Sequence, residues 1–395
     1  MDAVQLKNAA KTISRHARLY EIFPEKSNGL IISCKTSASM PIVKLSKKGV
    51  FIFHDLRFFD LLHHAVLGLN LFDNNIDLPT GKTMGRFHLD SLLWTTLAER
   101  SLNTVNEDLA LALGLLTQES MHYEHSLRTM GAYAPQLQVS NSTAKFETGL
   151  FQAFALGHEL AHFDFKSGEK QWSDKEIKTL LCILNLIDEQ AEALKSKPTS
   201  NPDILNMFVA VQKIRGSKTL FEEILADIAS ISSMLSGNMP PIWSGLPMDL
   251  RIWLVATTVL YGLAGTKLMT YVMAFAAQNR ADFEKTWVYN CELFDARITF
   301  LVKFFNLLIY SHPEDDLSES PEEINDKIYL FIHELFESLW QAEASLKPRF
   351  ERISELRADG QAIIERDALE RDAVFSICAT MLGWKSDKST GASHL

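Results

Sequence analysis

His158, Glu159 and His162 form the pattern His-Glu-x-x-His. On an α-helix, residues four apart lie on one face, one turn from each other, so both imidazoles can bind one metal ion. Glu159 projects about 100° round the helix from His158, which suits a general base better than a third ligand. A zinc ion lowers the pKa of its water to about 7, so hydroxide becomes available at neutral pH. The pattern is typical of zinc peptidases.

The residues around this pattern predict a buried helix. Apolar side chains occupy nearly every face of it, namely Leu150, Phe151, Phe154, Leu156, Leu160, Ala161 and Phe163. Two histidines and a glutamate inside such a helix cost free energy unless they are paired or bind a metal. The alternative is an ordinary buried helix whose histidines hydrogen-bond to neighbours. The apolar flanks favour the metal site.

A later helical stretch offers the ligand that the first one lacks. Catalytic zinc sites use three protein ligands, and an acceptor fixes the tautomer of a ligating histidine. Glu223 and Asp227 lie along one edge of an apolar stripe formed by Leu220, Ile224, Ile228, Ile231 and Leu235. Glu222 lies on the far side, and Thr219 to Glu222 fits a capping box, which gives Glu222 a structural role. We therefore predict Glu223 as the third ligand and Asp227 as the residue that orients a histidine; the alternative is a surface acidic pair.

Together the two stretches, His158-Glu159-x-x-His162 and Glu223-x-x-Ala226-Asp227, resemble the gluzincin zinc peptidases. In that group a later Glu-x-x-x-Asp helix completes the metal site. The long separation between His162 and Glu223 looks more like the HtpX and prenyl-protein protease group, or the phage-exclusion Lit-type peptidases, than like thermolysin. Asp164 departs from the resemblance, because such helices often continue apolar there. The resemblance implies zinc as the cofactor and peptide-bond hydrolysis as the reaction.

A peptidase of this type usually has a donor for the negative charge that develops on the substrate carbonyl. His312, in Ser311-His312-Pro313, is one candidate, since some relatives in the resemblance carry a His-Pro pair downstream. They usually follow it with an arginine, whereas residues 314–316 are acidic here. Tyr261 and Tyr271 are alternatives that fit the core equally well. The sequence leaves the oxyanion donor open.

Three other histidine groups are predicted to be structural. His63 and His64 are adjacent inside a helical pattern. His122 and His125 are three apart with no obvious third ligand, which favours a solvated polar face over a second metal site. The stretch from His333 imitates the pattern but has glutamate where the second histidine should stand.

Periodicity predicts a mainly helical fold with a small N-terminal β-sheet, an α+β class. Three short strand-like runs between residues 29 and 53 are separated by polar turns. The rest follows the helical period, with a capping box at Ser173 to Glu176. We predict an N-terminal α+β region over 1–88, a helical zinc-peptidase domain over 89–312 with a zincin-like helix pair, and a helical region with a mobile tail over 313–395.

The composition bears on the cellular location of the protein and on the kinds of partner it can bind. The 395 residues carry a net charge of −10, which offers no footprint for nucleic acid. The four cysteines show no C-x-x-C pattern, and residues 1–7 lack the apolar core of a signal peptide, so we expect a reducing, cytoplasmic location. Residues 252–266 are uncharged but fall short of the about 20 residues that a membrane span needs. We expect a buried helix pair there, broken near Gly262 and Gly265.

These observations predict a zinc-dependent peptidase that acts on a protein or peptide substrate within a narrow range. One alternative is a non-catalytic helical interaction protein whose zinc is structural or absent. Another is a membrane-associated metallopeptidase that uses residues 252–277. An open coordination position on the metal separates the first alternative from the peptidase.

Overall fold

The structure is a computed structural model. It describes residues 29–34, 42–46, 49–73, 89, 134–167, 172–196, 202–236, 246–277, 280–312 and 317–353. The helical period also predicts helices over about 1–28 and 91–130. These two segments, the pair His122 and His125, and the predicted mobile tail lie outside the described residues.

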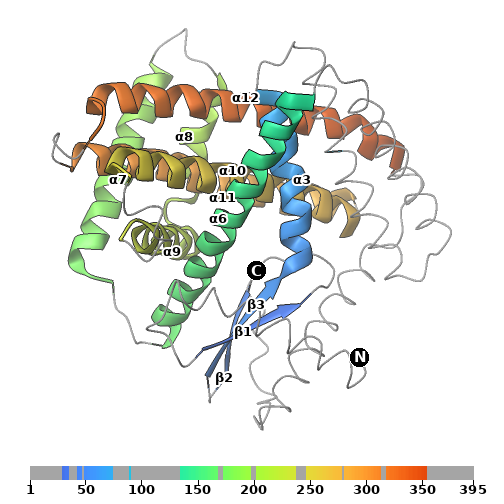
Figure 1. The fold of residues 1–395 in the computed structure, drawn as a ribbon, viewed down its shortest axis with the longest axis horizontal. Helices are drawn as coiled ribbons and strands as arrows, with labels where there is room; N and C mark the ends of the chain where they lie inside the picture. Colours follow the sequence, from blue (N-terminus) through green and yellow to red (C-terminus); the bar gives the residue numbers. More distant parts are fainter. Residues whose placement is uncertain are drawn as a thin grey trace.

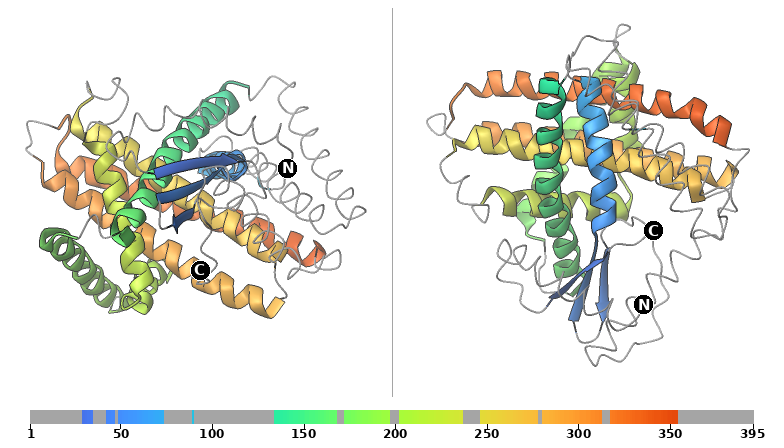
Figure 2. Two further views of the ribbon diagram at one scale, coloured as in Figure 1. Left: turned by 90° about the horizontal axis from the view of Figure 1, so that it is seen from below. Right: turned by 45° about the vertical axis from the view of Figure 1, so that its right-hand side comes forward.

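Helices build the body of the molecule. They are α3 (Leu56–Asp73), α6 (Ala134–Ser167), α7 (Asp174–Lys195), α8 (Pro202–Ile214), α9 (Lys218–Leu235), α10 (Met248–Ala277), α11 (Arg280–Tyr310) and α12 (Pro321–Ile353). In Figure 1 and in the right-hand view of Figure 2, α3 and α6 lie side by side and cross the direction of α10, α11 and α12. The predicted capping box of α7 is confirmed, because Ser173 and Glu176 exchange both of its hydrogen bonds.

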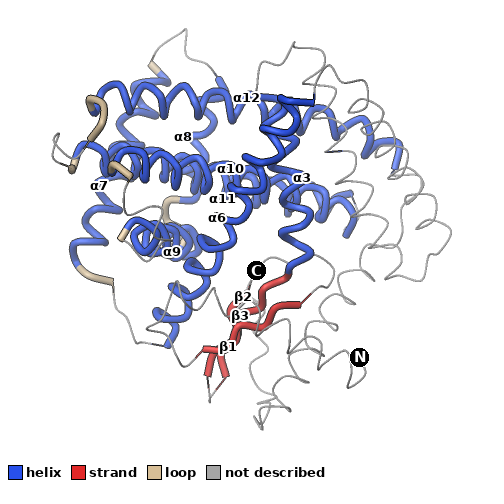
Figure 3. Tube along the Cα trace, in the orientation of Figure 1, coloured by secondary structure: helices blue, strands red, loops and turns tan. Residues whose placement is uncertain are grey.

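The predicted α+β fold class is wrong, and the protein is mainly α. From residue 56 to residue 353 the described segments contain no strand, and helices bury their apolar faces against other helices. Strands β1 (Gly29–Cys34), β2 (Ile42–Ser46) and β3 (Gly49–Asp55) pair in the order β1-β3-β2, beyond one end of this body (Figure 3). Strand-forming runs are present, but helix-on-helix packing, which needs no sheet layer, sets the architecture.

One continuous apolar core joins the helices. Its largest fully buried side chains include Phe58 and Phe59 of α3, Phe154 of α6, and Phe300 and Phe305 of α11. The same cluster extends to Leu346 of α12, so it includes residues on both sides of the predicted boundaries at 88/89 and 312/313. Those boundaries stay a prediction.

The expected helix pair over 252–277 is wrong, because α10 is a single continuous helix. Its glycines are contact points instead of breaks. A Cβ on Gly262 would collide with the ring of Phe151 on α6, and one on Gly265 would lie 2.8 Å from Cδ1 of Leu62 on α3. Among the described residues, Met248–Val272 is the one stretch apolar and long enough to cross a membrane, and 83% of its most apolar window is buried in the protein.

The close approach at Gly262 yields a stability prediction. Gly262→Ala should lower the free energy of unfolding by ~1–3 kcal/mol, because overpacking outweighs the gain in helix propensity. Gly149→Ala is the matched control, since nothing lies within 4 Å of its added Cβ, and it should raise that free energy by up to ~1 kcal/mol. Urea denaturation of both variants measures the two effects. A stabilised Gly262→Ala variant would contradict the described contact between α10 and α6.

Candidate metal centre

Helix α6 brings the two predicted histidine ligands together. It begins at Ala134, ten residues before the predicted start near Ala144, and runs through both histidines without a break. The Nε2 atoms of His158 and His162 lie 3.0 Å apart, and the ring of His158 is buried while that of His162 is partly exposed. The spacing of four residues therefore places both imidazole nitrogens at one point, as helix geometry requires.

Helix α9 lies against α6 and supplies the carboxylates. It begins at Lys218, so Thr219 stands inside the first turn and the predicted capping box of Thr219 and Glu222 does not form. Glu222 is exposed and pairs with Lys218 at 3.3 Å. Glu223, one residue later, points to the histidines: Oε2 lies 3.3 Å from Nε2 of His158 and Oε1 lies 3.2 Å from Nε2 of His162.

The three donor groups fit a transition metal. One ligand atom from each of His158, His162 and Glu223 lies within 4.8 Å of the others, and the closest separations are 3.0, 3.2 and 3.3 Å. Ligand atoms ~2.0–2.1 Å from a tetrahedral ion are ~3.3 Å apart. Within the described segments no fourth histidine, cysteine or carboxylate joins this group. Two imidazoles and a carboxylate suit zinc, and they also suit other divalent transition metals.

Asp227, the predicted orienting residue, contacts His158. Its fully buried Oδ1 accepts a hydrogen bond of 2.7 Å from Nδ1 of His158. That bond keeps a proton on Nδ1, so a metal that binds would displace the proton on Nε2, which faces Glu223 and His162.

Sequence reasoning missed Arg297. This arginine of α11 is buried and donates to Asp227 twice, from Nε to Oδ2 at 2.9 Å and from Nη2 to Oδ1 at 2.7 Å. Its Nη1 also lies 3.0 Å from Oε2 of Glu223. The only local signal is an arginine directly before the apolar run from Ile298 to Tyr310, and helix period does not show which residue that arginine contacts.

The charges of this cluster shift each other's pKa values. Burial lowers the pKa of His158, but the charges of Glu223 and Asp227 and their hydrogen bonds outweigh burial and raise that pKa to about 10. Burial raises the pKa of Glu223 and of Asp227, but Arg297 and His158 outweigh it and hold both carboxyls below their usual range. Without a metal, the centre is therefore a set of paired charges.

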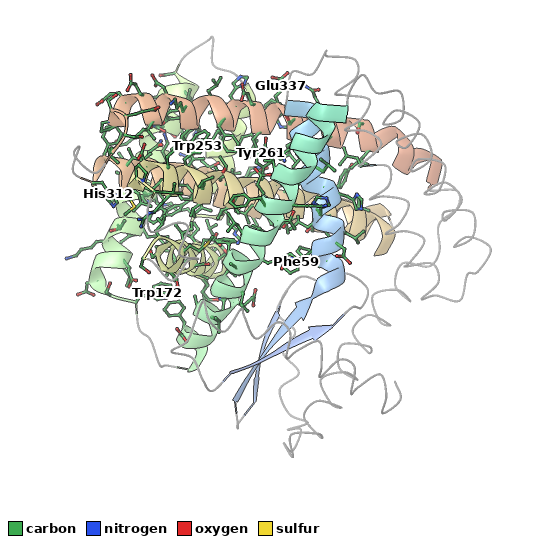
Figure 4. The ribbon with its side chains drawn as sticks, in the orientation of Figure 1. Phe59, Trp172, Trp253, Tyr261, His312 and Glu337 are labelled. Atoms are coloured by element: carbon green, nitrogen blue, oxygen red, sulfur yellow. The ribbon has the colours of Figure 1, made fainter. Side chains whose placement is uncertain are left out.

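His312 hydrogen-bonds to the end of the helix that precedes it, α11. It follows the end of α11, and its Nδ1 donates to the backbone oxygen of Leu308 at 2.7 Å. Among the described residues no hydrogen bond or ion pair joins His312 to the three metal-binding side chains. Tyr261 and Tyr271 are both buried in α10, and Figure 4 shows His312 and Tyr261 well apart. The oxyanion role of His312 stays a prediction.

The chain matches no protein-family model, and no curated protein or solved structure matches it significantly.

The choice of Glu223 over Glu222 can be tested by metal titration. Glu223→Gln should remove tight zinc binding, because an amide oxygen replaces a charged ligand. Glu222→Gln changes the neighbouring residue on the exposed side of the same helix and should bind zinc as the wild type does. Calorimetric titration of metal-free protein with zinc measures both variants. Equal losses in the two variants would show that the carboxylate at 223 is not a ligand.

The raised pKa of His158 predicts a pH effect. At pH 8 a solvated histidine has lost its second proton, whereas His158, with a pKa of about 10, retains it. Zinc must displace that proton from Nε2, so zinc binding at pH 8 should release about one proton, and the apparent affinity should rise with pH until the pKa is passed. Calorimetry in buffers of different ionisation enthalpy counts the protons. A release near zero at pH 8 would contradict the shift.

Proposed function

We propose that this chain is a zinc-dependent peptidase. The observation that carries the proposal is the meeting of His158, His162 and Glu223 from two helices in a donor set that no further histidine, cysteine or carboxylate of the described segments joins. Three protein ligands and an open position are typical of catalytic zinc sites, whereas structural sites are closed by a fourth ligand. Glu159, which follows His158 in α6, is the proposed general base.

Each residue of the centre has one task in this reaction. Zinc, when bound, would polarise the scissile carbonyl and make a water more acidic. Glu159 accepts a proton from the attacking water and passes it to the nitrogen of the leaving amine, as the hydroxyl joins the carbonyl carbon and the C–N bond breaks. Glu159 is partly exposed, so a substrate can approach it, and its charge contributes to the raised pKa of Arg297. Asp227 keeps His158 in the ligating tautomer.

The proposed substrate is a protein or peptide, and the proposed range is narrow. A peptidase that works in the cytoplasm must spare the proteins around it, so selectivity or regulation is required. The acidic net charge of −10 favours no nucleic-acid partner. Cytoplasmic location and the absence of membrane attachment belong to the same proposal.

Glu159→Gln separates catalysis from metal binding. The variant should lose cleavage by at least about 100-fold, since a positioned general base contributes ~10²–10⁴-fold, and it should still bind zinc because all three ligands remain. Lysate proteins are exposed to wild type, to Glu159→Gln and to the control Glu222→Gln, and new termini are identified by mass spectrometry. The wild type and Glu222→Gln should produce the same new termini.

Two results would overturn the proposal, and a third would change the role of Glu159. Termini that Glu159→Gln also produces would mean that another group does the chemistry. A wild-type protein that binds zinc and produces no new terminus in any lysate or peptide library would favour a non-catalytic metal protein. Loss of zinc together with cleavage in Glu159→Gln would mean that Glu159 is a ligand.

A further inference from the structure

Arg297 contacts both carboxylates of the centre with one planar group. Three of its nitrogens are used: Nε and Nη2 on Asp227, at 2.9 and 2.7 Å, and Nη1 on Glu223, at 3.0 Å. The side chains of Arg297 and Asp227 are only 6% and 0% exposed. Arginine can do this because its five N–H donors form a rigid fork, whereas lysine offers one point charge.

The contact on Glu223 has a geometric consequence. Arg297 holds Oε2 of Glu223, and Oε1 lies 3.2 Å from Nε2 of His162. Arg297 holds one oxygen of Glu223 and also the orienting partner of His158, so fewer side-chain orientations of Glu223 remain to be ordered when a metal binds. A partly exposed glutamate that lacked this contact would lose more rotamer freedom when a metal binds, and would bind it more weakly.

We propose that Arg297 is a positioning residue of the metal centre: it fixes Glu223 and Asp227 in their ligating arrangement before the metal arrives. The proposal rests on the metal centre and does not require peptide hydrolysis. Because Arg297 belongs to α11, the proposed centre uses residues of three helices, α6, α9 and α11.

A simpler role for Arg297 would be that of a counter-ion, and the two roles predict opposite signs. A positive charge beside a cation site repels the metal, so removing a mere counter-ion should tighten metal binding. Removing a positioning residue should weaken it, because partners of metal ligands typically contribute 10–100-fold in affinity. Charge alone can also be supplied by lysine, whereas the two-carboxylate fork cannot.

Another buried cationic side chain serves as a matched control for the loss of Arg297. Lys267 of α10 is buried like Arg297 and also pairs with two carboxylates, Asp295 at 3.0 Å and Glu343 at 3.1 Å. Neither partner belongs to the metal-binding group. Lys267→Met should therefore reproduce the loss of stability without changing the metal site.

The experiment titrates metal-free wild type, Arg297→Met, Arg297→Lys and Lys267→Met with Co²⁺. Visible absorption follows the titration, because the Co²⁺ spectrum reports coordination geometry and filled-shell zinc has none. We expect both Arg297 variants to bind Co²⁺ 10–100-fold more weakly, with altered spectra. Lys267→Met should keep the wild-type affinity and spectrum while its thermal midpoint falls.

Several outcomes would overturn this role. Unchanged or tighter Co²⁺ binding by Arg297→Met would make Arg297 a counter-ion, as would wild-type behaviour of Arg297→Lys. If Arg297→Met does not fold, Arg297→Lys alone decides between fork and charge. A wild type that binds no Co²⁺ would remove the metal centre and with it both proposals. A wild type that binds Co²⁺ but cleaves nothing would remove only the peptidase.

Discussion

Two carboxylates of α9 are held by cationic side chains of two other helices, and the geometry of the centre depends on that pairing. A buried charge costs several kcal/mol unless opposite charges and hydrogen bonds compensate it. Asp227 is completely buried and receives hydrogen bonds from Arg297 of α11 and His158 of α6. Helices α6, α9 and α11 can therefore shift relative to one another only if a buried ion pair breaks. The packing of these helices thus fixes the positions of His158 and Glu223.

Helix α11 joins this cluster to a second one. Arg297 turns to α9, while Asp295, two residues earlier, contacts Lys267 of α10. Glu343 of α12 completes the second cluster, and burial raises the pKa of its carboxyl more than Lys267 lowers it. Because Asp295 and Arg297 lie within one turn of α11, the cluster around Asp227 is linked to α10 and α12 as well as to α6 and α9.

The sequence was sufficient where chemistry follows helix period. Spacing brought His158 and His162 together, and helix phase separated Glu223 from Glu222, because Glu223 contacts His158 in the structure whereas Glu222 pairs with Lys218. The sequence was insufficient where two contacting residues lie far apart along the chain. Arg297 meets Asp227 across 70 residues of chain, and no local period encodes that contact. Gly262 was interpreted as a helix break because small residues serve both breaks and close packing, and only the position of Phe151 decides between them. The prediction of an α+β fold class was wrong for a related reason. Strand-forming runs show that strands can form, but not how much of the core a sheet supplies.

The pairing within the cluster also bears on what a metal does for folding. In zinc fingers and many small metal-binding domains no preformed site exists, so metal binding supplies the folding free energy and the metal-free chain unfolds. Here Asp227 and Glu223 both contact Arg297, and His158 contacts both carboxylates. A divalent ion would replace a proton on His158 and leave the contacts of Arg297 with Asp227 in place. A metal that bound at the proposed site would therefore enter a centre whose side chains are already held by contacts within the protein.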